Sequence, residues 1–375
     1  MGCTASVSKK IYNVGRKKKL VIPEVIVFVP TMRIPVDTDL QRALKGIIPR
    51  DLVDKLSTLR SQISLLAEDT GGSAYTQLNG ALERYLPVVL GLTKKVYSIE
   101  DKVEFRWKNL QDRRQETYMV SSWFEVLCVV YMMAILSLLE ANSLLLPNNP
   151  MDASDRTVSE DSKKDAIDLL IKAAGYLEFC FRDILICLPP DIKNKLPKDF
   201  QEGVLEALSI QALGEGTEMQ LGLAVESQKA STSVKRRLAC EQLSYFAQAH
   251  YCLSECDMTH GCGKKHLMYI RWKYIEAKAA AYYYHGLILD KGNEPSSHIS
   301  AKIPEVASRK SQMYGYLLEQ EKALQSLPDL PDFPLSLRPD DYKLPELDPA
   351  WESGKWEVEV PTLKEHLKDA EDGTN

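Results

Sequence analysis

Apolar residues recur at every third or fourth position over most of the chain, beginning near Asp37. This period places them on one face of an α-helix, so the pattern predicts a succession of amphipathic helices. Pro49 precedes the first long helix, and Gly71-Gly72 ends it. The apolar face of that helix consists of Leu52, Leu56, Leu59, Ile63 and Leu66. A second helix is expected over ALERYLPVVLGLTKKV, with a kink at Pro87.

The helical period continues beyond residue 115 in long stretches separated by short polar or proline-rich connections. We expect helices over about 116–145, 160–187, 199–229, 232–257, 264–290 and 298–326. Long helices with short connections and almost no strand predict an all-α architecture. Two stretches, 238–253 and 274–289, are rich in alanine and tyrosine, which is typical of closely stacked tetratricopeptide-like helices. Because no strict period of about 34 residues is visible, we interpret the chain as an irregular solenoid.

Three stretches depart from this pattern. Residues 21–30, VIPEVIVFVP, are β-branched and alternating, and they predict a strand. Residues 126–139 are continuously apolar, but about 21 Å of helix is shorter than a hydrocarbon core of about 30 Å. We interpret them as a buried core helix. Seven prolines fall between Pro328 and Pro361, which predicts an extended segment along the helices, docked through Trp351 and Trp356.

Charge is distributed unevenly along the chain. The first 19 residues contain no acid, and their basic residues are Lys9, Lys10, Arg16, Lys17, Lys18 and Lys19. The remainder is therefore more acidic than the net charge of −5 indicates. A basic tip on an acidic body argues against general nucleic-acid binding. It suits contact with an anionic membrane surface, although a nuclear-localisation signal is an alternative.

The N-terminus carries an acylation motif. MGCTAS fits the pattern in which Gly2 is myristoylated after removal of Met1, with Ser6 at the hydroxyl position. One myristoyl chain anchors a protein only marginally. Palmitoylation of Cys3 and the basic cluster would supply the second signal. Since no apolar core of a signal peptide precedes Lys9, we expect an intracellular protein without disulfides.

Residues with catalytic or metal-binding chemistry are few. A group of potential zinc ligands consists of His250, Cys252, Cys256, His260, Cys262 and His266. Its spacing lacks a C-x2-C pair, so we expect no metal and keep zinc as an alternative. The sequence contains no G-x-S-x-G, P-loop, G-x-G-x-x-G or H-E-x-x-H motif. We therefore expect no cofactor and no enzymatic activity.

Four segments in order resemble the Bro-one (BRO1-type) domain family of ESCRT-associated proteins, its stand-alone Brox-like members most. They are EVIVFVPTMRIPVDTDLQRAL, VEFRWKNLQDRRQETYMVSSWFEVLCVVYMMAILSLLEA, DAIDLLIKAAGYLEFC and LGEGTEMQLGLAVESQKASTSVKRRLACEQLSYFAQA. The resemblance implies a curved, banana-shaped helical solenoid with a tetratricopeptide-like core, a small N-terminal β element and an extended proline-rich C-terminal segment. It also implies a non-catalytic role.

In this family an apolar patch on the concave face binds the C-terminal amphipathic helix of the ESCRT-III core filament subunit. By resemblance, the matching positions are Val234 and Leu238, with the neighbouring anchor at Gln220 or Leu221. Packing between helices is the alternative role of Val234 and Leu238. Where the family has an alanine-rich helix, Gly214 and Gly216 are expected to loosen it. Relatives can carry a C-terminal prenylation box, whereas this chain ends in DGTN.

These observations lead to one hypothesis and its alternatives. We expect a lipidated basic segment at 1–19, a Bro-one-type helical domain at 20–360 and an acidic tail at 361–375. The leading hypothesis is a membrane-anchored adaptor on the cytoplasmic face of the endosomal or plasma membrane that binds ESCRT-III. A lipid-anchored helical adaptor for another peptide or protein is the first alternative. A metal-dependent or enzymatic helical protein is the second.

Overall fold

A computed structural model describes residues 26–111, 116–146, 158–256, 261–289 and 329–351. The predictions for the N-terminal 19 residues, the helix at 298–326 and the acidic tail lie outside these ranges. In the described part the expected solenoid is confirmed: the fold is predominantly helical, with one small sheet.

The sheet is antiparallel and lies near the N-terminus. Strand β1 (Arg33–Pro35) pairs with β2 (Glu104–Asn109), which pairs with β3 (Glu116–Val120), in the order β1-β2-β3. Ile34 lies opposite Lys108, and Trp107 lies opposite Thr117. The strand predicted at 21–30 is wrong for its described residues, since 26–30 run without strand pairing. The backbone of Phe28 bonds instead to side chains of a later helix.

Strand β3 replaces the start of the helix predicted from residue 116, and its partner β2 precedes that helix. In β2, Phe105, Trp107 and Asn109 are buried, while the charged residues between them are not. This alternation is the period of a half-buried strand. The helix begins only after β3, at Ser122, because the side chain of Ser121 accepts a bond from the Phe124 amide and caps the first turn.

Three helices follow β1: α1 (Leu40–Leu44), α2 (Arg50–Thr70) and, before β2, α3 (Tyr75–Val89). Gly71 ends α2 in the left-handed conformation, with φ of 60°, which glycine adopts without strain. In place of the expected kink at Pro87, α3 ends two residues later. Two 3-10 turns then lead toward β2, at Leu90–Thr93 and Lys95–Tyr97.

Helix α4 (Ser122–Leu144) forms the centre of the molecule. It is long and apolar enough to cross a membrane, yet 89% of its apolar window is buried inside the protein, which supports its interpretation as a core helix. Its Glu125 is fully buried and pairs with the Arg60 guanidinium at 2.8 Å. The Tyr85 hydroxyl and the Trp107 indole also donate to Glu125, at 2.9 and 2.6 Å. This carboxylate therefore ties α2, α3 and β2 to α4.

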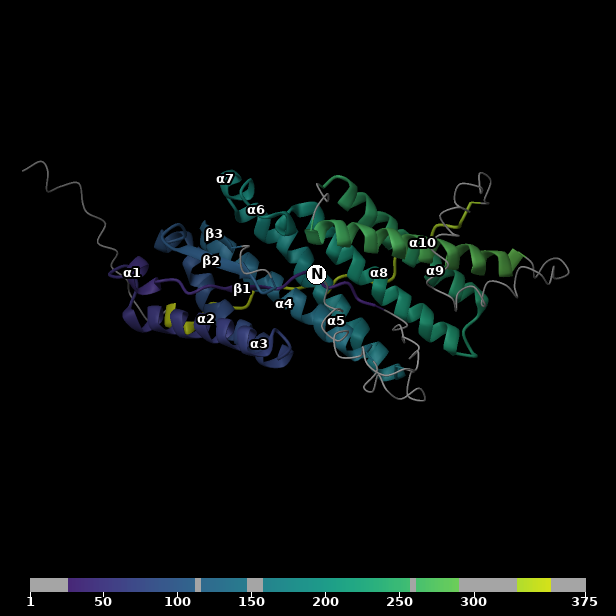
Figure 1. Ribbon diagram of the computed structural model, residues 1–375, viewed down its shortest axis with the longest axis horizontal. Helices are drawn as coiled ribbons and strands as arrows, with labels where there is room; N and C mark the ends of the chain where they lie inside the picture. Colours follow the sequence, from purple (N-terminus) through teal and green to yellow (C-terminus); the bar gives the residue numbers. More distant parts are fainter. Residues whose placement is uncertain (1–25, 112–115, 147–157, 257–260, 290–328, 352–375) are drawn as a thin grey trace, which may run out of the picture.

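The remaining helices stack in sequence order. They are α5 (Glu160–Phe179), α6 (Leu185–Cys187), α7 (Pro190–Lys193), α8 (Glu202–Glu226), α9 (Thr232–Ser254) and α10 (Gly261–Leu289). A π-helical turn, Cys180–Ile184, joins α5 to α6, and a 3-10 turn, Lys198–Phe200, precedes α8. Helices α4, α5, α8, α9 and α10 each pack on the next. Figure 1 shows the result, an elongated molecule with α1–α3 toward one end and α9 and α10 at the other.

Two glycines of α8 serve helix packing. A Cβ atom at Gly214 would lie 3.2 Å from the Tyr245 Cβ and 3.1 Å from the Phe246 ring. A Cβ at Gly216 would lie 3.0 Å from a methyl group of Leu337. Helix α8 runs through both positions without interruption. The expectation that they loosen this region is wrong, because each lets a neighbouring element come close.

The C-terminal segment, residues 329–351, is extended and lies along the helices, as predicted. It ends in a 3-10 turn, Pro349–Trp351. Trp351 is 1% exposed, and its indole donates to the Val88 carbonyl at 2.8 Å. Gly91 makes room for this ring, because a Cβ there would lie 1.8 Å from it. Trp356 lies outside the described residues.

Candidate partner-binding surface

The predicted partner-contact residues lie on the antiparallel hairpin of α8 and α9. Ser231 caps α9 by accepting a bond from the Val234 amide at 3.3 Å. One face of α9 carries four residues spaced four, three and four positions apart: Val234, Leu238, Glu241 and Tyr245. We call these four residues the α9 stripe. Val234 is 46% exposed and Leu238 is half-buried.

The two candidate positions on α8 are less accessible. Leu221 is 8% exposed and packs in a cluster with Ala239, Cys240 and Ala281, between α8, α9 and α10. Gln220 is half-buried. Val225, in the last turn of α8, is 48% exposed. The accessible apolar side chains at this end of the hairpin are therefore the two valines.

The C-terminal segment contacts the Glu241–Tyr245 half of the α9 stripe. The Ser336 amide donates to the Glu241 carboxylate at 3.0 Å, and the Tyr245 hydroxyl donates to the Leu337 carbonyl at 2.6 Å. Burial raises the pKa of Tyr245 to about 12, so its hydroxyl remains a donor at physiological pH. Leu330 and Phe333 pack against the cluster that contains Leu221. The candidate surface is thus partly occupied by the chain itself.

The charge beside the stripe is basic. Lys235, Arg236 and Arg237 follow one another in the second turn of α9. The Arg236 guanidinium lies 5.7 Å from the centre of the Phe333 ring, a cation–π contact. Arg237 pairs with Glu241 at 2.7 Å. A partner on this surface therefore meets apolar side chains flanked by positive charge.

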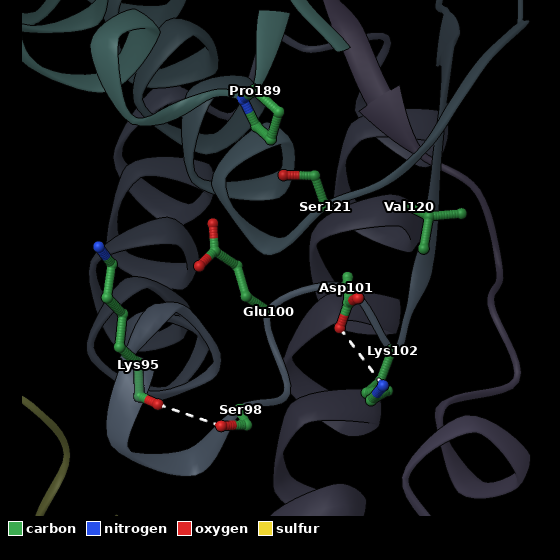
Figure 2. Close-up of a pocket in the computed structure, with 8 residues that line it drawn as sticks. All are labelled: Lys95, Ser98, Glu100, Asp101, Lys102, Val120, Ser121 and Pro189. Carbon is green, nitrogen blue, oxygen red and sulfur yellow. Dashed lines mark hydrogen bonds and ion pairs between the residues drawn. The ribbon is translucent and has the colours of Figure 1, made fainter. Parts of the chain in front are cut away.

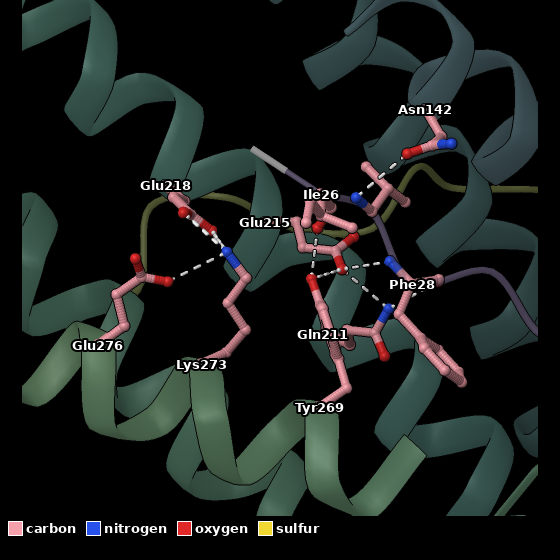
Figure 3. A network of polar contacts seen from close by, with 10 residues as sticks. Ile26, Phe28, Asn142, Gln211, Glu215, Glu218, Tyr269, Lys273 and Glu276 are labelled. Atoms are coloured by element: carbon pink, nitrogen blue, oxygen red, sulfur yellow. Dashed lines mark hydrogen bonds and ion pairs between the residues drawn. The ribbon is translucent and has the colours of Figure 1, made fainter. Parts of the chain in front are cut away.

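A buried polar network holds the N-terminal segment against α8 and α10 (Figure 3). The Phe28 amide donates to Glu215 at 3.2 Å, and its carbonyl accepts from Gln211 at 3.0 Å. His266 stacks on the Phe28 ring with centroids 4.8 Å apart, and its Nε2 lies 2.7 Å from the Gln211 oxygen. Burial lowers the pKa of His266 to about 3, so the ring is neutral.

Glu215 is the acidic centre of this network. Burial raises its pKa to about 8, against the opposing effects of the Tyr269 hydroxyl and the Lys273 charge. The Tyr269 oxygen lies 2.6 Å from the Ile26 carbonyl and 2.7 Å from Glu215. A hydroxyl has one proton to donate. When the Tyr269 hydroxyl donates to the Ile26 carbonyl, the bond between Tyr269 and Glu215 requires a proton on the Glu215 carboxyl group.

Lys273 forms the adjoining ion-pair cluster (Figure 3). Its ammonium lies 2.7 and 2.8 Å from the two Glu218 oxygens and 3.4 Å from Glu276. Burial alone lowers the pKa of Lys273, but these two carboxylates outweigh burial and raise it. The cluster joins α8 to α10 and keeps a buried lysine charged.

An open cleft of about 620 Å³ lies beside β3, away from the α9 stripe (Figure 2). Its lining consists of Lys95, Ser98, Glu100, Asp101, Lys102, Val120, Ser121 and Pro189. Burial raises the pKa of Glu100. Asp101 pairs with Lys102 at 3.5 Å. The lining carries both signs of charge, and nothing in it selects one class of ligand.

The potential zinc ligands separate in space where they are described. His266 is buried in the network around Phe28. His250 lies 3.3 Å from the Arg271 Nε, and the Cys256 thiol faces Gly203 of α8. Within the described ranges no three His, Cys, Asp or Glu side chains form a metal-binding group. His260 and the side chain of Cys262 lie outside them.

The predicted lipid-bearing residues Gly2 and Cys3 also lie outside the described residues. The same holds for the membrane-contact residues Lys9, Lys10, Arg16, Lys17, Lys18 and Lys19. The first described residue, Ile26, belongs to the segment that Glu215 and Gln211 hold. A lipid on Gly2 would thus join the body of the protein through this segment.

The family model for the BRO1-like domain matches residues 38–318. The chain belongs to the BRO1-like domain family. A Bro1 domain studied for endosomal targeting is similar in fold, with 16% identity, a TM-score of 0.57, and coverage of 88% of this chain and 95% of that chain. The ALIX BRO1 domain in complex with CHMP4C has 16% identity and a TM-score of 0.55, covering 87% and 97%.

ALIX bound to the SIVmac239 PYKEVTEDL late domain has 18% identity and a TM-score of 0.57 over 80% of this chain and 44% of that chain. At these identities the solved structures show a shared fold. No curated protein sequence matches the chain. The membership of the BRO1-like family rests on the family model.

Two features of this surface and its surroundings escaped the sequence prediction. Glu241 and Tyr245 continue the spacing of Val234 and Leu238 along α9, and that continuation was an available signal. A glutamate among small and apolar residues, as at Glu215 in ALGEGT, is a second signal, because burial of a carboxyl group requires partners. The partners themselves, from residues 26–28 and 336–337, are remote in sequence.

Proposed function

We propose that this protein is an adaptor that binds the C-terminal amphipathic helix of an ESCRT-III core subunit. Membership of the BRO1-like domain family supports a binding role, and the ALIX BRO1 domain of similar fold forms a complex with CHMP4C, an ESCRT-III subunit. The observation that carries the proposal is Val234, an apolar side chain 46% exposed on the first turn of a long, rigid helix. Apolar anchors on a fixed surface are what an amphipathic helix requires.

The charges around Val234 restrict the partner further. Lys235, Arg236 and Arg237 place positive charge beside the apolar anchor. A partner helix with acidic residues flanking its apolar face would gain favourable electrostatic contacts and faster association. We therefore propose an amphipathic helix with an acidic border.

We further propose that lipids on Gly2 and Cys3 hold the adaptor on the cytoplasmic face of an endosomal or plasma membrane. The support is the N-terminal motif MGCTAS and the basic cluster that follows it. A myristoyl chain binds membranes weakly alone, so palmitoylation or the basic cluster has to add to it.

The partner surface is tested by binding a peptide of the ESCRT-III C-terminal helix, measured by fluorescence anisotropy. We expect Val234→Asp to weaken binding about tenfold or more, because it places a charge in an apolar contact. Tyr251→Asp is the matched control, since Tyr251 is 68% exposed on the same helix but off the stripe. Equal binding by wild type and Val234→Asp would exclude this surface.

The anchor is tested by imaging tagged wild type, Gly2→Ala and Val234→Asp in cells. We expect wild type and Val234→Asp on membranes and Gly2→Ala in the cytosol, because Gly2 is the only acceptor that the motif provides. Cytosolic wild type would refute the anchor while leaving the partner surface unaffected.

A lipid-anchored adaptor for a different peptide is the second candidate. The observation that favours it is the small amount of free apolar surface, since Leu221 is 8% exposed and Leu238 is half-buried. A pull-down that recovers a partner lost in Val234→Asp, but no ESCRT-III subunit, would support this candidate.

A further inference from the structure

Residues 329–337, which we call the strap, form a one-sided extended segment along α9. Phe333, Leu335 and Leu337 are half-buried, and the residues between them are exposed. This alternation is that of a strand with one face on a surface. The strap lacks strand pairing. Among the described residues, it is held by side chains of α9 and by apolar packing.

The strap is held less firmly than the rest of the C-terminal segment. Beyond it, Tyr342 packs edge-on against Tyr176 and Phe179, with ring centroids 4.7 and 5.2 Å away. Asp348 pairs with Lys55 at 2.6 Å, and Trp351 is fully enclosed. The strap, by contrast, contains no fully buried side chain. It can therefore leave α9 while the distal residues stay docked.

The strap and a partner helix require the same face of α9. The stripe from Val234 to Tyr245 is about 17 Å long at 1.5 Å per residue. A bound amphipathic helix uses anchors over about two turns or more. Of the four stripe residues, Glu241 and Tyr245 are hydrogen-bonded to the strap, and Leu238 packs against the same apolar cluster as Leu330 and Phe333 of the strap. Among the described residues, the open part of the stripe is Val234 with the half-buried Leu238, about one helical turn, which is too little surface for a helix.

We infer that the strap is an intramolecular occupant of the partner surface and that an amphipathic helix binds by displacing it. Leu330 and Phe333 cover the apolar cluster that the partner's own anchors would contact. The inference rests on the proposed function, since the displacing ligand is the helix proposed there. It adds autoinhibition: affinity depends on how firmly residues 329–337 are held.

The test compares the affinity of the ESCRT-III helix peptide for wild type, Phe333→Ala and Leu344→Ala. We expect Phe333→Ala to bind about fivefold more tightly, because it loses about half of a phenylalanine contact that holds the strap. Leu344→Ala is the matched control: it also truncates a half-buried side chain of the C-terminal segment, but beyond the strap. Its affinity is expected to equal that of wild type. Circular dichroism confirms that each variant is folded.

Hydrogen exchange gives a second measurement on the unmodified protein. Saturating peptide is expected to increase amide exchange in residues 330–337 and to leave 342–351 unchanged. Weaker or unchanged binding by Phe333→Ala, or greater protection of 330–337, would overturn displacement while the proposed function stands. Failure of the peptide to bind any of the three proteins would refute the proposed function, and the inference with it.

Discussion

Two extended segments cross α8 on different sides, and they are held in different ways. On one side, the amide and carbonyl of Phe28 bond to Glu215 and Gln211, both fully buried. On another side, Leu337 contacts Gly216 and is bonded by Tyr245. The N-terminal segment is therefore part of the core, whereas the strap lies on its surface.

This difference determines what each segment can do. Removal of the N-terminal segment would break the two Phe28 bonds to the buried Glu215 and Gln211, at about 1–3 kcal/mol for each bond, and would remove the ring stacked on His266. Removal of the strap would open Glu241 and Tyr245 to water, and Glu241 would keep its bond to Arg237. When the polar partners of a segment can hydrogen-bond to water instead, that segment can be replaced by another ligand.

The largest effect is expected at the end of the C-terminal segment, where it resembles the core. Trp351→Ala is expected to lower the free energy of unfolding by about 3–5 kcal/mol, since it empties a fully buried site. Gly91→Ala would displace the same ring. Urea denaturation of both single variants and the double variant checks this. Because both changes disrupt the same packing of Trp351 against Gly91, additive losses of unfolding free energy in the double variant would contradict this prediction.

The next effect concerns the N-terminal segment and depends on pH. The folded state raises the pKa of Glu215 from 4.5 to about 8, so the folded protein keeps a proton that the unfolded chain releases. Stability is therefore highest below the unfolded value and decreases as the pH rises toward 8. Glu215→Gln removes this loss, and its advantage over wild type should grow by about 2 kcal/mol from pH 5.5 to 7.

Urea denaturation at several pH values measures this advantage. Gln248→Glu provides a contrast, because that position on α9 is exposed. Its stability difference from wild type should stay nearly constant with pH. A constant difference for Glu215→Gln as well would show that Glu215 is ionised in the folded protein.

The smallest effect is expected in the strap. Phe333→Ala should lower the free energy of unfolding by about 1 kcal/mol, because its ring is half-buried. Thermal denaturation followed by circular dichroism compares it with Trp351→Ala. A loss as large as that of Trp351→Ala would show that the strap is as firmly fixed as the end of the segment.

Local pattern was a good guide wherever one helix face decides the structure. Residues 160–187, 199–229 and 232–257 were predicted as helices, and α5, α8 and α9 lie within them. The pattern misled at 116–120, where pairing with β2 imposes a strand on residues that also fit a helix. It also misled at 26–30, where buried side chains take the place of a neighbouring strand.

For the candidate site too, the sequence predicts some features and the tertiary structure decides others. Val234 and Leu238 could be placed on one helix face from their spacing of four residues. Their exposure to solvent could not be predicted in this way, because it depends on residues about 100 positions away. Leu221 and Val225 are both apolar and lie one turn apart, yet one is 8% and the other 48% exposed. The position of α10 and the strap, which pack against Leu221, accounts for this difference in exposure.

The sequence by itself determined the helical solenoid, the buried nature of α4 and the docking of the proline-rich segment, because periodicity and composition act over neighbouring residues. The tertiary structure alone decided that Gly91 and Gly216 are spaces for Trp351 and Leu337. It alone decided that Glu215 binds the N-terminal segment and that the strap covers part of the α9 stripe. Those contacts join residues about 95 to 260 positions apart, and burial sets their strength only after the chain has folded.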